Sequence, residues 1–514
     1  MPAVLNYPGV YIEEVRSTVR TITGVATSVT AFVGRARKGP MDNDAQGLSP
    51  VRVRSFGEFE RVFGGLWEEA PMSFALNQYF QNGGGEALVI RVGAGASLAA
   101  ASLALNDDVA ALALTLTAAN PGSWGAGVEV TIDRNDGLGG SLAAPLFNLS
   151  LRDTTTDERE TYFGVSPAAT HPRSVQRLLE GSALARATSA GPTARPANVA
   201  AQLLAAPADA DGAAVTAAEV LTGPGLQAAR RGIFALDRSD IFNLLVIPPY
   251  APGADVAAAD LSNALTYCRA RRAVLLVDPP AATDTVNEAI DHANAVGRDT
   301  NAAFFFPRMR APNPLRNNAL EDFAPCGAVA GVIARTDASR GVWKSAAGIE
   351  ATVNGAQALA VKLTDGQSGD LNPQGVNCLR DFPVYGRVVW GARTLAGADP
   401  LASEWKYLAV RRTALFLEES LYRGTQWVVF EPNDEPLWSQ IRLNLGAFMH
   451  NLFRQGAFQG STPREAYFVK CDAQTTTQND INLGIVNIAV GFAPLKPAEF
   501  VVIRLQQMAG NVAT

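Results

Sequence analysis

Asp278 and His292 are the two residues of this sequence that come closest to a catalytic pair. Asp278 ends the apolar run AVLLVDPP, which is typical of a buried parallel strand, and α/β enzymes often place chemistry at that end of a strand. His292 follows in a predicted helix, so the two could serve a serine hydrolase. Such an enzyme also needs a serine held against the histidine, and no Gly-Thr-Ser stretch follows. Pro279 and Pro280 indicate instead that the strand ends there.

The residues that could bind a metal or a phosphate are spaced wrongly for either. The histidines share no metal-ligand spacing, and the cysteines lie far apart without a CxxC pair. The glycines at 83–85 follow a predicted helix and precede a strand, the reverse of the order used for phosphate, so we interpret them as a helix end and turn. We expect no cofactor, no metal and buried thiols. The residues concerned are His171, His292, His450, Cys268, Cys326, Cys378 and Cys471.

The composition is that of a globular protein. Of 514 residues, 47% are hydrophobic and 18% charged, and the formal net charge is −6. This acidic balance argues against direct binding of nucleic acid, which needs a basic surface. No apolar run approaches the roughly 18 residues of a membrane span, and the N-terminus lacks the features of a secretory signal. We expect a chain folded in the cytosol, with no membrane insertion.

The elements that would position a site alternate as in an α/β protein. Strand, helix, strand, helix and strand follow one another over residues 240–307, which predicts a parallel sheet with right-handed crossovers. In the helix that follows, Gly327, Ala330 and Gly331 leave room for close packing against a neighbour. The fold class is therefore α/β, within a chain that is α+β overall.

Residues 94–235 have a different character. The alternating stretches VEVTIDR, APLFNLSLRD and ETYFGVS predict an antiparallel sheet with one solvated face. Residues 181–224 are rich in Ala, Gly, Asp and Pro and are interpreted as long surface loops. Nothing in this insertion resembles a chemical site.

The last third of the chain contains two amphipathic helices, and the chain begins and ends with predicted strands. In the second helix apolar residues recur at spacings of three and four, so one stripe is expected to be buried. The terminal strands have no partner nearby in the sequence, although a strand must hydrogen-bond to something. The stripe consists of Leu437, Ile441, Leu445, Phe448 and Leu452.

Seven motifs follow one another along the two ends of the chain: PGVYIEEV, RTITGVATSVTAFVGRARKGP, AVAGVIARTDASRGVWKSAAG, VYGRVVWGARTL, VRRTALFLEESLYRGTQWVVFEPND, GSTPREAYFVKCD and APLKPAEFVVIRLQQ. In this order they resemble contractile tail sheath proteins, which form the sheaths of contractile phage tails and of related bacterial injection particles. The likeness covers residues 5–92 and about 325–507, whereas the middle matches in layout only.

The resemblance implies a multidomain subunit in which a subtilisin-like parallel α/β domain keeps the fold of a hydrolase without its triad. It also implies no enzymatic activity, although a subtilisin-like hydrolase using Asp278 and His292 remains the alternative from another class. The expected parts are an N-terminal arm (1–20), an inner sheath segment (21–93), an inserted outer β-rich domain (94–235), the subtilisin-like domain (236–380), a C-terminal sheath domain (381–495) and a C-terminal arm (496–514).

The resemblance further implies that both terminal strands complete a sheet in neighbouring subunits, which makes a helical homo-oligomer. Residues 16–28 would then form a flexible strap. The expected arm contacts are Val10, Tyr11, Ile12, Glu13, Glu14 and Val15 at the N-terminus, and Phe500, Val501, Val502, Ile503 and Arg504 at the C-terminus.

As a sheath, the chain would assemble in the bacterial cytoplasm around an inner tube, in a metastable extended state, and contract to drive the tube through a target envelope. Its partners would be other copies of itself, the tube protein, a baseplate and terminator or cap proteins. Arg442 and Arg454 are candidate contacts to an acidic tube. A specialised or terminal sheath paralogue is the structural alternative, and the motifs do not separate the two.

Overall fold

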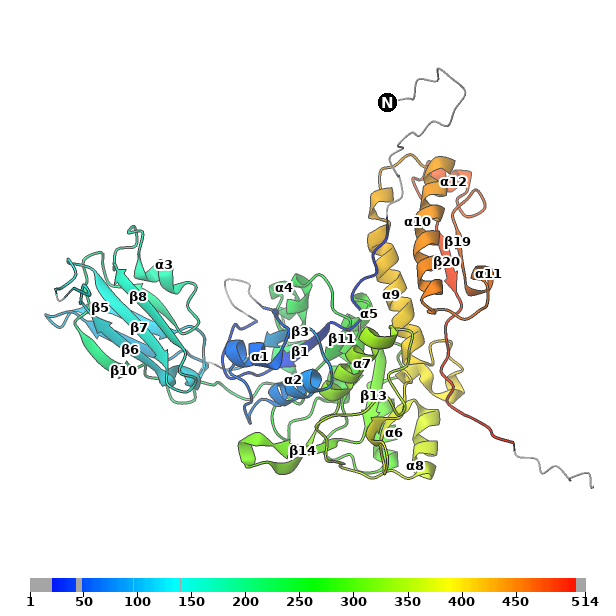
Figure 1. Ribbon diagram of the computed structural model, residues 1–514, viewed down its shortest axis with the longest axis horizontal. Helices are drawn as coiled ribbons and strands as arrows, with labels where there is room; N and C mark the ends of the chain where they lie inside the picture. The colour runs from blue at the N-terminus through cyan, green and yellow to red at the C-terminus, as the bar shows by residue number, and fades with distance from the viewer. Residues whose placement is uncertain (1–20, 43–48, 96, 139, 505–514) are drawn as a thin grey trace, which may run out of the picture. The chain divides into compact units, whose positions relative to one another are not determined.

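The computed structural model of the protein describes residues 21–42, 49–95, 97–138 and 140–504. The chain divides into two compact units. The first, here called the sheet unit, comprises Ala26–Ala338 and Ala346–Lys406. The second, the helical unit, contains the segment ending at Val25, Ser339–Ser345 and the chain from Tyr407 onward. Figure 1 shows the elements of both units, coloured along the chain.

An eight-stranded sheet forms the centre of the sheet unit, in the order β18-β17-β13-β12-β11-β1-β3-β2. The six inner strands pair in parallel, whereas β2 and β18 pair antiparallel at the two edges. Parallel sheets occur almost only in α/β proteins, where helices cover both faces of the sheet. The predicted α/β class is therefore confirmed. The strands are β1 (Thr30–Gly34), β2 (Val51–Val53), β3 (Ala87–Arg91), β11 (Leu244–Val246), β12 (Val274–Val277), β13 (Ala302–Phe306), β17 (Val376–Phe382) and β18 (Gly386–Val389).

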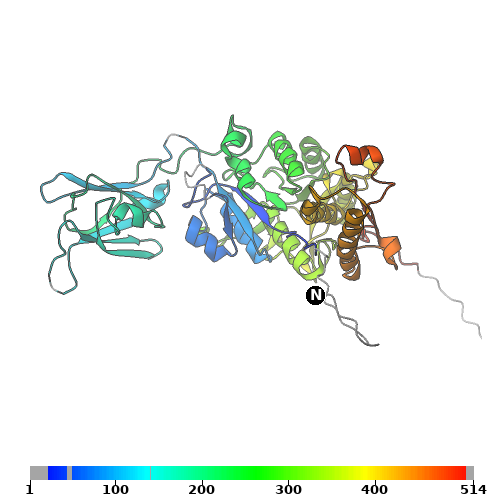
Figure 2. The ribbon, with the colours of Figure 1, turned by 90° about the horizontal axis from the view of Figure 1, so that it is seen from above.

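Helices cover both faces of this sheet, as Figure 1 and Figure 2 show. On one face the Phe32 ring of β1 lies 5.4 Å, edge-on, from Tyr79 of α2. The next residue, Val33, points the other way into the core shared with α5 and α6, because side chains alternate along a strand. The helices of this unit are α1 (Phe56–Phe63), α2 (Pro71–Gln81), α3 (Val175–Leu179), α4 (Leu226–Ala229), α5 (Ala258–Ala270), α6 (Val286–Val296), α7 (Cys326–Arg340) and α8 (Asp365–Leu371).

Two glycines allow α7 to pack closely against α2. A Cβ atom on Gly327 would lie 2.4 Å from the Ala75 carbonyl oxygen, and one on Gly331 would lie 2.4 Å from the Tyr79 carbonyl oxygen. Contacts this short with backbone atoms cannot be relieved by a rotamer change. The close helix packing predicted from these glycines is confirmed.

Two antiparallel sheets make up the insertion between β3 and β11. One has the order β4-β5-β9 and the other β10-β6-β7-β8, and their apolar side chains share one core. The prediction of loops over 181–224 is wrong at two places, where β9 and β10 form. Nearly all side chains of β10 are exposed, so its sequence lacks the alternating pattern that predicts a strand. The strands are β4 (Ser102–Asn106), β5 (Leu112–Ala118), β6 (Val128–Asp133), β7 (Phe147–Asp153), β8 (Arg159–Val165), β9 (Ala185–Ser189) and β10 (Val199–Leu203).

The chain enters and leaves this insertion side by side. Ala94 and Ala213 form an antiparallel bridge at its base. Lys38, from the loop after β1, is buried there with its Nζ 3.9 Å from Asp153 and 3.8 Å from Glu158. The base of the insertion is thus held by backbone pairing and by one buried lysine. A separate small sheet in the same unit contains β14 (Met309–Asn313), β15 (Ala319–Phe323) and β16 (Ala358–Leu359).

The packing of α7 predicts a large effect of one methyl group. Gly331→Ala should lower the free energy of unfolding by about 1–3 kcal/mol, because the new Cβ forces α7 away from the backbone of α2. Gly369→Ala in α8 is the matched control, since a Cβ there meets nothing within 4 Å, and it should be neutral or stabilising. Chemical denaturation of the subunit measures both, and equal stabilities for the two variants would contradict the close-packing argument.

Candidate functional site

Asp278 lies at the carboxyl end of β12, as predicted, but its side chain serves the fold. Its Oδ1 accepts a hydrogen bond of 2.8 Å from the Cys326 amide, the first of helix α7. Burial raises the pKa of this carboxyl to about 6. A carboxylate at this position satisfies an amide that has no partner within the helix and interacts favourably with the helix dipole.

His292 lies near Asp278 without forming a catalytic arrangement with it. Its ring is 5.3 Å from Phe304, and burial lowers its pKa. The thiol of Cys326 interacts with Asp278, and burial raises the pKa of this thiol well above its usual value. A thiol held in its protonated form is a poor nucleophile. The neighbourhood of Asp278 therefore supports a structural role more than hydrolysis.

The remaining expectations about chemistry concern thiols, metals and membranes. All four cysteines are buried and free, which confirms the prediction of buried thiols. Over the described ranges, no group of three or more His, Cys, Asp and Glu is placed to hold a metal ion. In the same part of the chain, no helix combines the length and the apolar character needed to span a bilayer.

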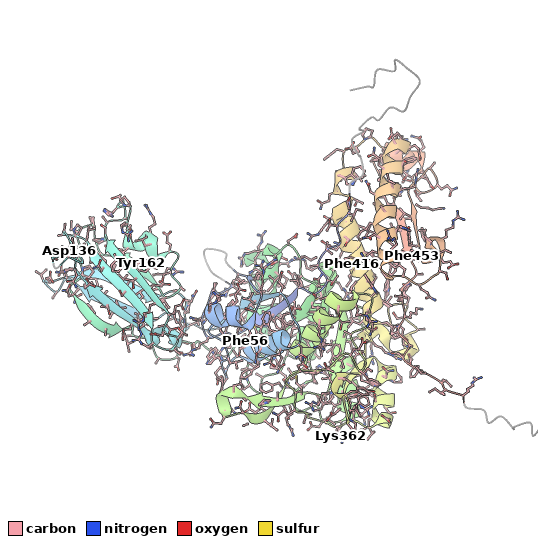
Figure 3. All side chains as sticks on the ribbon, viewed as in Figure 1. Phe56, Asp136, Tyr162, Lys362, Phe416 and Phe453 are labelled. Carbon is pink, nitrogen blue, oxygen red and sulfur yellow. The ribbon has the colours of Figure 1, made fainter. Side chains whose placement is uncertain are left out.

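The helical unit is built on two long helices, α9 (Leu408–Gly424) and α10 (Glu435–Arg454). They run side by side in Figure 1, with Phe416 of α9 and Phe453 of α10 labelled in Figure 3. The whole predicted stripe of α10 is buried in one core cluster with Leu417 of α9. This confirms the amphipathic pattern of α10. Two short helices, α11 (Pro463–Ala466) and α12 (Gln478–Asn482), complete the unit.

A two-stranded antiparallel sheet packs beside α10. Tyr467 of β19 (Tyr467–Lys470) pairs with Phe492 of β20 (Ala489–Phe492), and Lys470 pairs with Ala489. Among the described residues no further strand joins this sheet, so each strand keeps one open edge. The Phe468 side chain is 54% exposed. Two strands alone are marginally stable, and an open edge is a template for another strand.

The C-terminal segment that follows β20 exposes four consecutive apolar side chains. Phe500, Val501, Val502 and Ile503 are 76–81% exposed, and neither they nor Arg504 belong to a strand of this chain. The predicted strand is therefore not formed within the subunit. Just before it, the Tyr407 hydroxyl donates a hydrogen bond of 3.3 Å to Glu499. The N-terminal arm contacts predicted at Val10, Tyr11, Ile12, Glu13, Glu14 and Val15 lie outside the described residues.

The two arginines suggested as tube contacts differ in their surroundings. Arg442 forms an ion pair with Glu435 and donates a hydrogen bond to the Cys471 carbonyl. Arg454 is exposed and has no ion pair within the described segments. Twelve residues of helix place them about 18 Å apart along the axis and about 120° apart around it. They therefore cannot form one compact contact surface.

The loop between α9 and α10 presents an exposed aromatic residue that the sequence analysis missed. Phe430 is fully exposed and has a φ of +70°, and the preceding Val429 is 64% exposed. Asn433 holds the loop, because its Nδ2 donates to the Ile485 carbonyl (3.0 Å) while its Oδ1 accepts from Trp438 Nε1 (2.9 Å). A positive φ is costly for a bulky residue. The available sequence signal was the run VVF between two predicted helices.

The burial of Asp278 predicts a pH dependence of stability. Its pKa in the folded chain, about 6, exceeds the ordinary value of 3.8. The folded state thus holds this proton more tightly than the unfolded state. The stability that it contributes is fully present below about pH 4 and is lost as the pH rises through 6. Asp278→Asn keeps the acceptor and should remove this component, which is at most about 3 kcal/mol.

Thermal or urea unfolding of wild type and variant between pH 4 and pH 7.5 measures this component. Asp291→Asn on the exposed face of α6 is the matched control. An Asp278→Asn variant whose stability varies with pH as the wild type does would show that the Asp278 carboxyl is not the titrating group.

Comparison with known proteins extends this structural picture. The family profile of the phage tail sheath protein central domain matches residues 219–395, and that of the phage tail sheath C-terminal domain matches residues 402–508. The two matches together span more than half of the chain.

Curated relatives and solved structures agree with the profiles. A putative prophage major tail sheath protein of Pseudomonas aeruginosa (strain UCBPP-PA14) is 27% identical over 296 residues, which are 55% of this chain and 70% of that protein. The tail sheath protein of Burkholderia phage BcepMu is 25% identical over 474 residues, which are 88% of this chain and 87% of that protein.

In fold, the chain is similar to the sheath of an extracellular contractile injection system, PVC, in its contracted state. The TM-score is 0.58, the identity 22%, and the coverage 98% of this chain and 99% of that one. The contracted helical sheath of the anti-feeding prophage gives a TM-score of 0.58, an identity of 23%, and coverage of 98% and 100%. On the two profile matches the chain belongs to the phage tail sheath protein family, whose members are structural subunits of phage tails.

Proposed function

We propose that copies of this chain polymerise by donating terminal strands to the β19–β20 sheet of neighbouring copies. The observation that carries the proposal is a complementary pair of features in the helical unit. Within the described ranges the sheet has two open edges, and the C-terminal segment Phe500–Ile503 is a row of exposed apolar residues without a strand partner. Strand addition supplies backbone hydrogen bonds, and alternate side chains supply apolar contacts.

The N-terminal strand predicted at residues 10–15 is the second donor in this proposal, so that one two-stranded sheet accepts an arm on each side. A donor and an acceptor on different surfaces make a head-to-tail contact, which does not close on a dimer and generates a helical polymer. Full burial of a Val, Ile or Phe side chain contributes about 1.5–3 kcal/mol. Phe500–Ile503 therefore carry enough apolar surface for a durable joint.

The polymer in this proposal surrounds an inner tube and joins a baseplate at one end. It assembles extended and contracts when triggered, while the arm joints keep neighbouring subunits connected. In this proposal the subunit hydrolyses no nucleotide. The free energy for contraction comes from new contacts that form between neighbouring subunits as the polymer contracts. Small gains in buried area for each subunit add up over the polymer, at about 25 cal/mol per Å².

The joint is tested by one substitution and one deletion. Val501→Asp should leave the isolated subunit as stable as the wild type, because Val501 is 81% exposed, but it should abolish tube-like polymers by burying a charge. Deletion of residues 2–15 should likewise give a folded subunit that does not polymerise. Negative-stain electron microscopy and sedimentation of the purified chain, with and without the tube protein, measure both.

The matched control is Val109→Asp, since Val109 is 82% exposed on a loop of the insertion. It should polymerise as the wild type does. Normal sheaths from either arm variant would refute strand donation by that arm, whereas loss of sheaths in the Val109→Asp variant would point to a general effect of added charge.

For the tube contact we propose Arg454, which is exposed and unpaired among the described residues. Arg454→Glu should weaken tube-templated assembly several-fold without changing the melting temperature, and the loss should diminish at high salt. Arg442→Glu should instead lower the melting temperature, because Arg442 is paired with Glu435. Tube-templated assembly that survives charge reversal at both positions would rule out this surface.

A further inference from the structure

The segment Thr21–Val25 packs against helix α9 through Ile22, Gly24 and Val25. Ile22 is only 7% exposed and belongs to the apolar core of the helical unit. A Cβ on Gly424 would lie 2.7 Å from both Cγ1 and Cγ2 of Ile22, and a Cβ on Gly24 would lie 2.8 Å from the Phe416 ring. The glycine on each side thus makes room for a side chain from the other. We call this arrangement the seat.

A hydrogen bond completes the seat. The Val25 amide donates to the Ser420 hydroxyl at 3.2 Å, and Ser420 is fully buried. Phe416, Ser420 and Gly424 are spaced four residues apart, so they share one face of α9 over about 12 Å. The segment therefore contacts the helix at three successive turns, through packing at two of them and through a hydrogen bond at the third.

We propose that the seat is the fixed point from which the N-terminal arm leaves the subunit, and that it sets how far the arm can reach. The partner of the arm is thus a second copy of the chain. The arm reaches that copy through the residues between its strand and the seat, here called the tether. This inference rests on the proposed strand donation, in which residues 10–15 pair with a neighbour. Ile22, Gly24 and Gly424 are then positioning residues, because they act on assembly only by holding the base of the arm.

The reach follows from chain geometry. From Val15 to Ile22 there are seven residues, which span at most about 25 Å. Without the seat, the first residue that is held by a hydrogen bond is Ala26. Its carbonyl accepts from Asn243 Nδ2 at 2.8 Å. The tether then has eleven residues and spans at most about 40 Å. With the longer tether, the effective concentration of the donated strand at the neighbour's sheet falls about twofold at each contact between subunits. The direction in which the arm leaves the subunit is also no longer fixed.

Gly424→Ala tests the seat. The added Cβ should displace Ile22, so the Val25 amide should exchange its hydrogen at least about tenfold faster in the isolated subunit, and polymer yield should fall. Adding Ile22→Ala removes the three atoms that the new Cβ meets, so the double variant should recover slow exchange and polymer yield relative to Gly424→Ala alone. Gly446→Ala is the matched control, since a Cβ there meets nothing within 4 Å, and it should change neither.

The outcomes separate this inference from the proposed function. Unchanged exchange at Val25, or effects of the two substitutions that simply add, would overturn the seat. Faster exchange with normal polymer yield would overturn its role in setting the reach while leaving strand donation intact. Normal sheaths from the deletion of residues 2–15 would overturn strand donation itself, and the exchange experiment would still report on the seat. If Gly424→Ala fails to fold, Gly24→Ala tests the seat through its contact with Phe416.

Discussion

The structure depends on one constraint: the amides and carbonyls along a strand edge must be hydrogen-bonded to a partner. Among the described residues, no further strand joins the β19–β20 sheet, and Phe500–Ile503 are exposed and belong to no strand. A monomeric protein would normally cover an open strand edge with another element or place charged side chains on it. In the described part of this chain, both the open sheet edges and the exposed C-terminal segment lie in the helical unit, and the proposed strand donation would satisfy both.

The sheet unit shows the opposite property. Its parallel sheet resembles an enzyme scaffold, with Asp278 where a catalytic acid would stand, but the hydrogen bond from the Cys326 amide commits that carboxyl to holding helix α7. Gly327 and Gly331 lock the same helix against α2. Asp278 and the two glycines thus serve one purpose, which is to hold helix α7 in place in the sheet unit.

Much of this was predictable from sequence, and the failures have physical causes. The buried stripe of α10, the close packing at Gly331 and the parallel order of the central strands follow from local pattern. Strand β10 was missed because its side chains are exposed, so nothing alternates. The pairing of Arg442 with Glu435 could have been noticed, since residues seven apart share a helix face. The contact of Ile22 with Gly424 joins residues far apart in the chain, which no local pattern reveals.

The bridge between Ala94 and Ala213 at the base of the insertion has an evolutionary consequence. Because the chain departs and returns at adjacent points, a lineage can enlarge, shrink or exchange everything beyond that bridge without changing the order of a single strand in the central sheet. A replacement has only to keep the paired entry and exit and a carboxylate for Lys38. The insertion and the central sheet can therefore change in sequence and length independently of one another, apart from these few shared contacts.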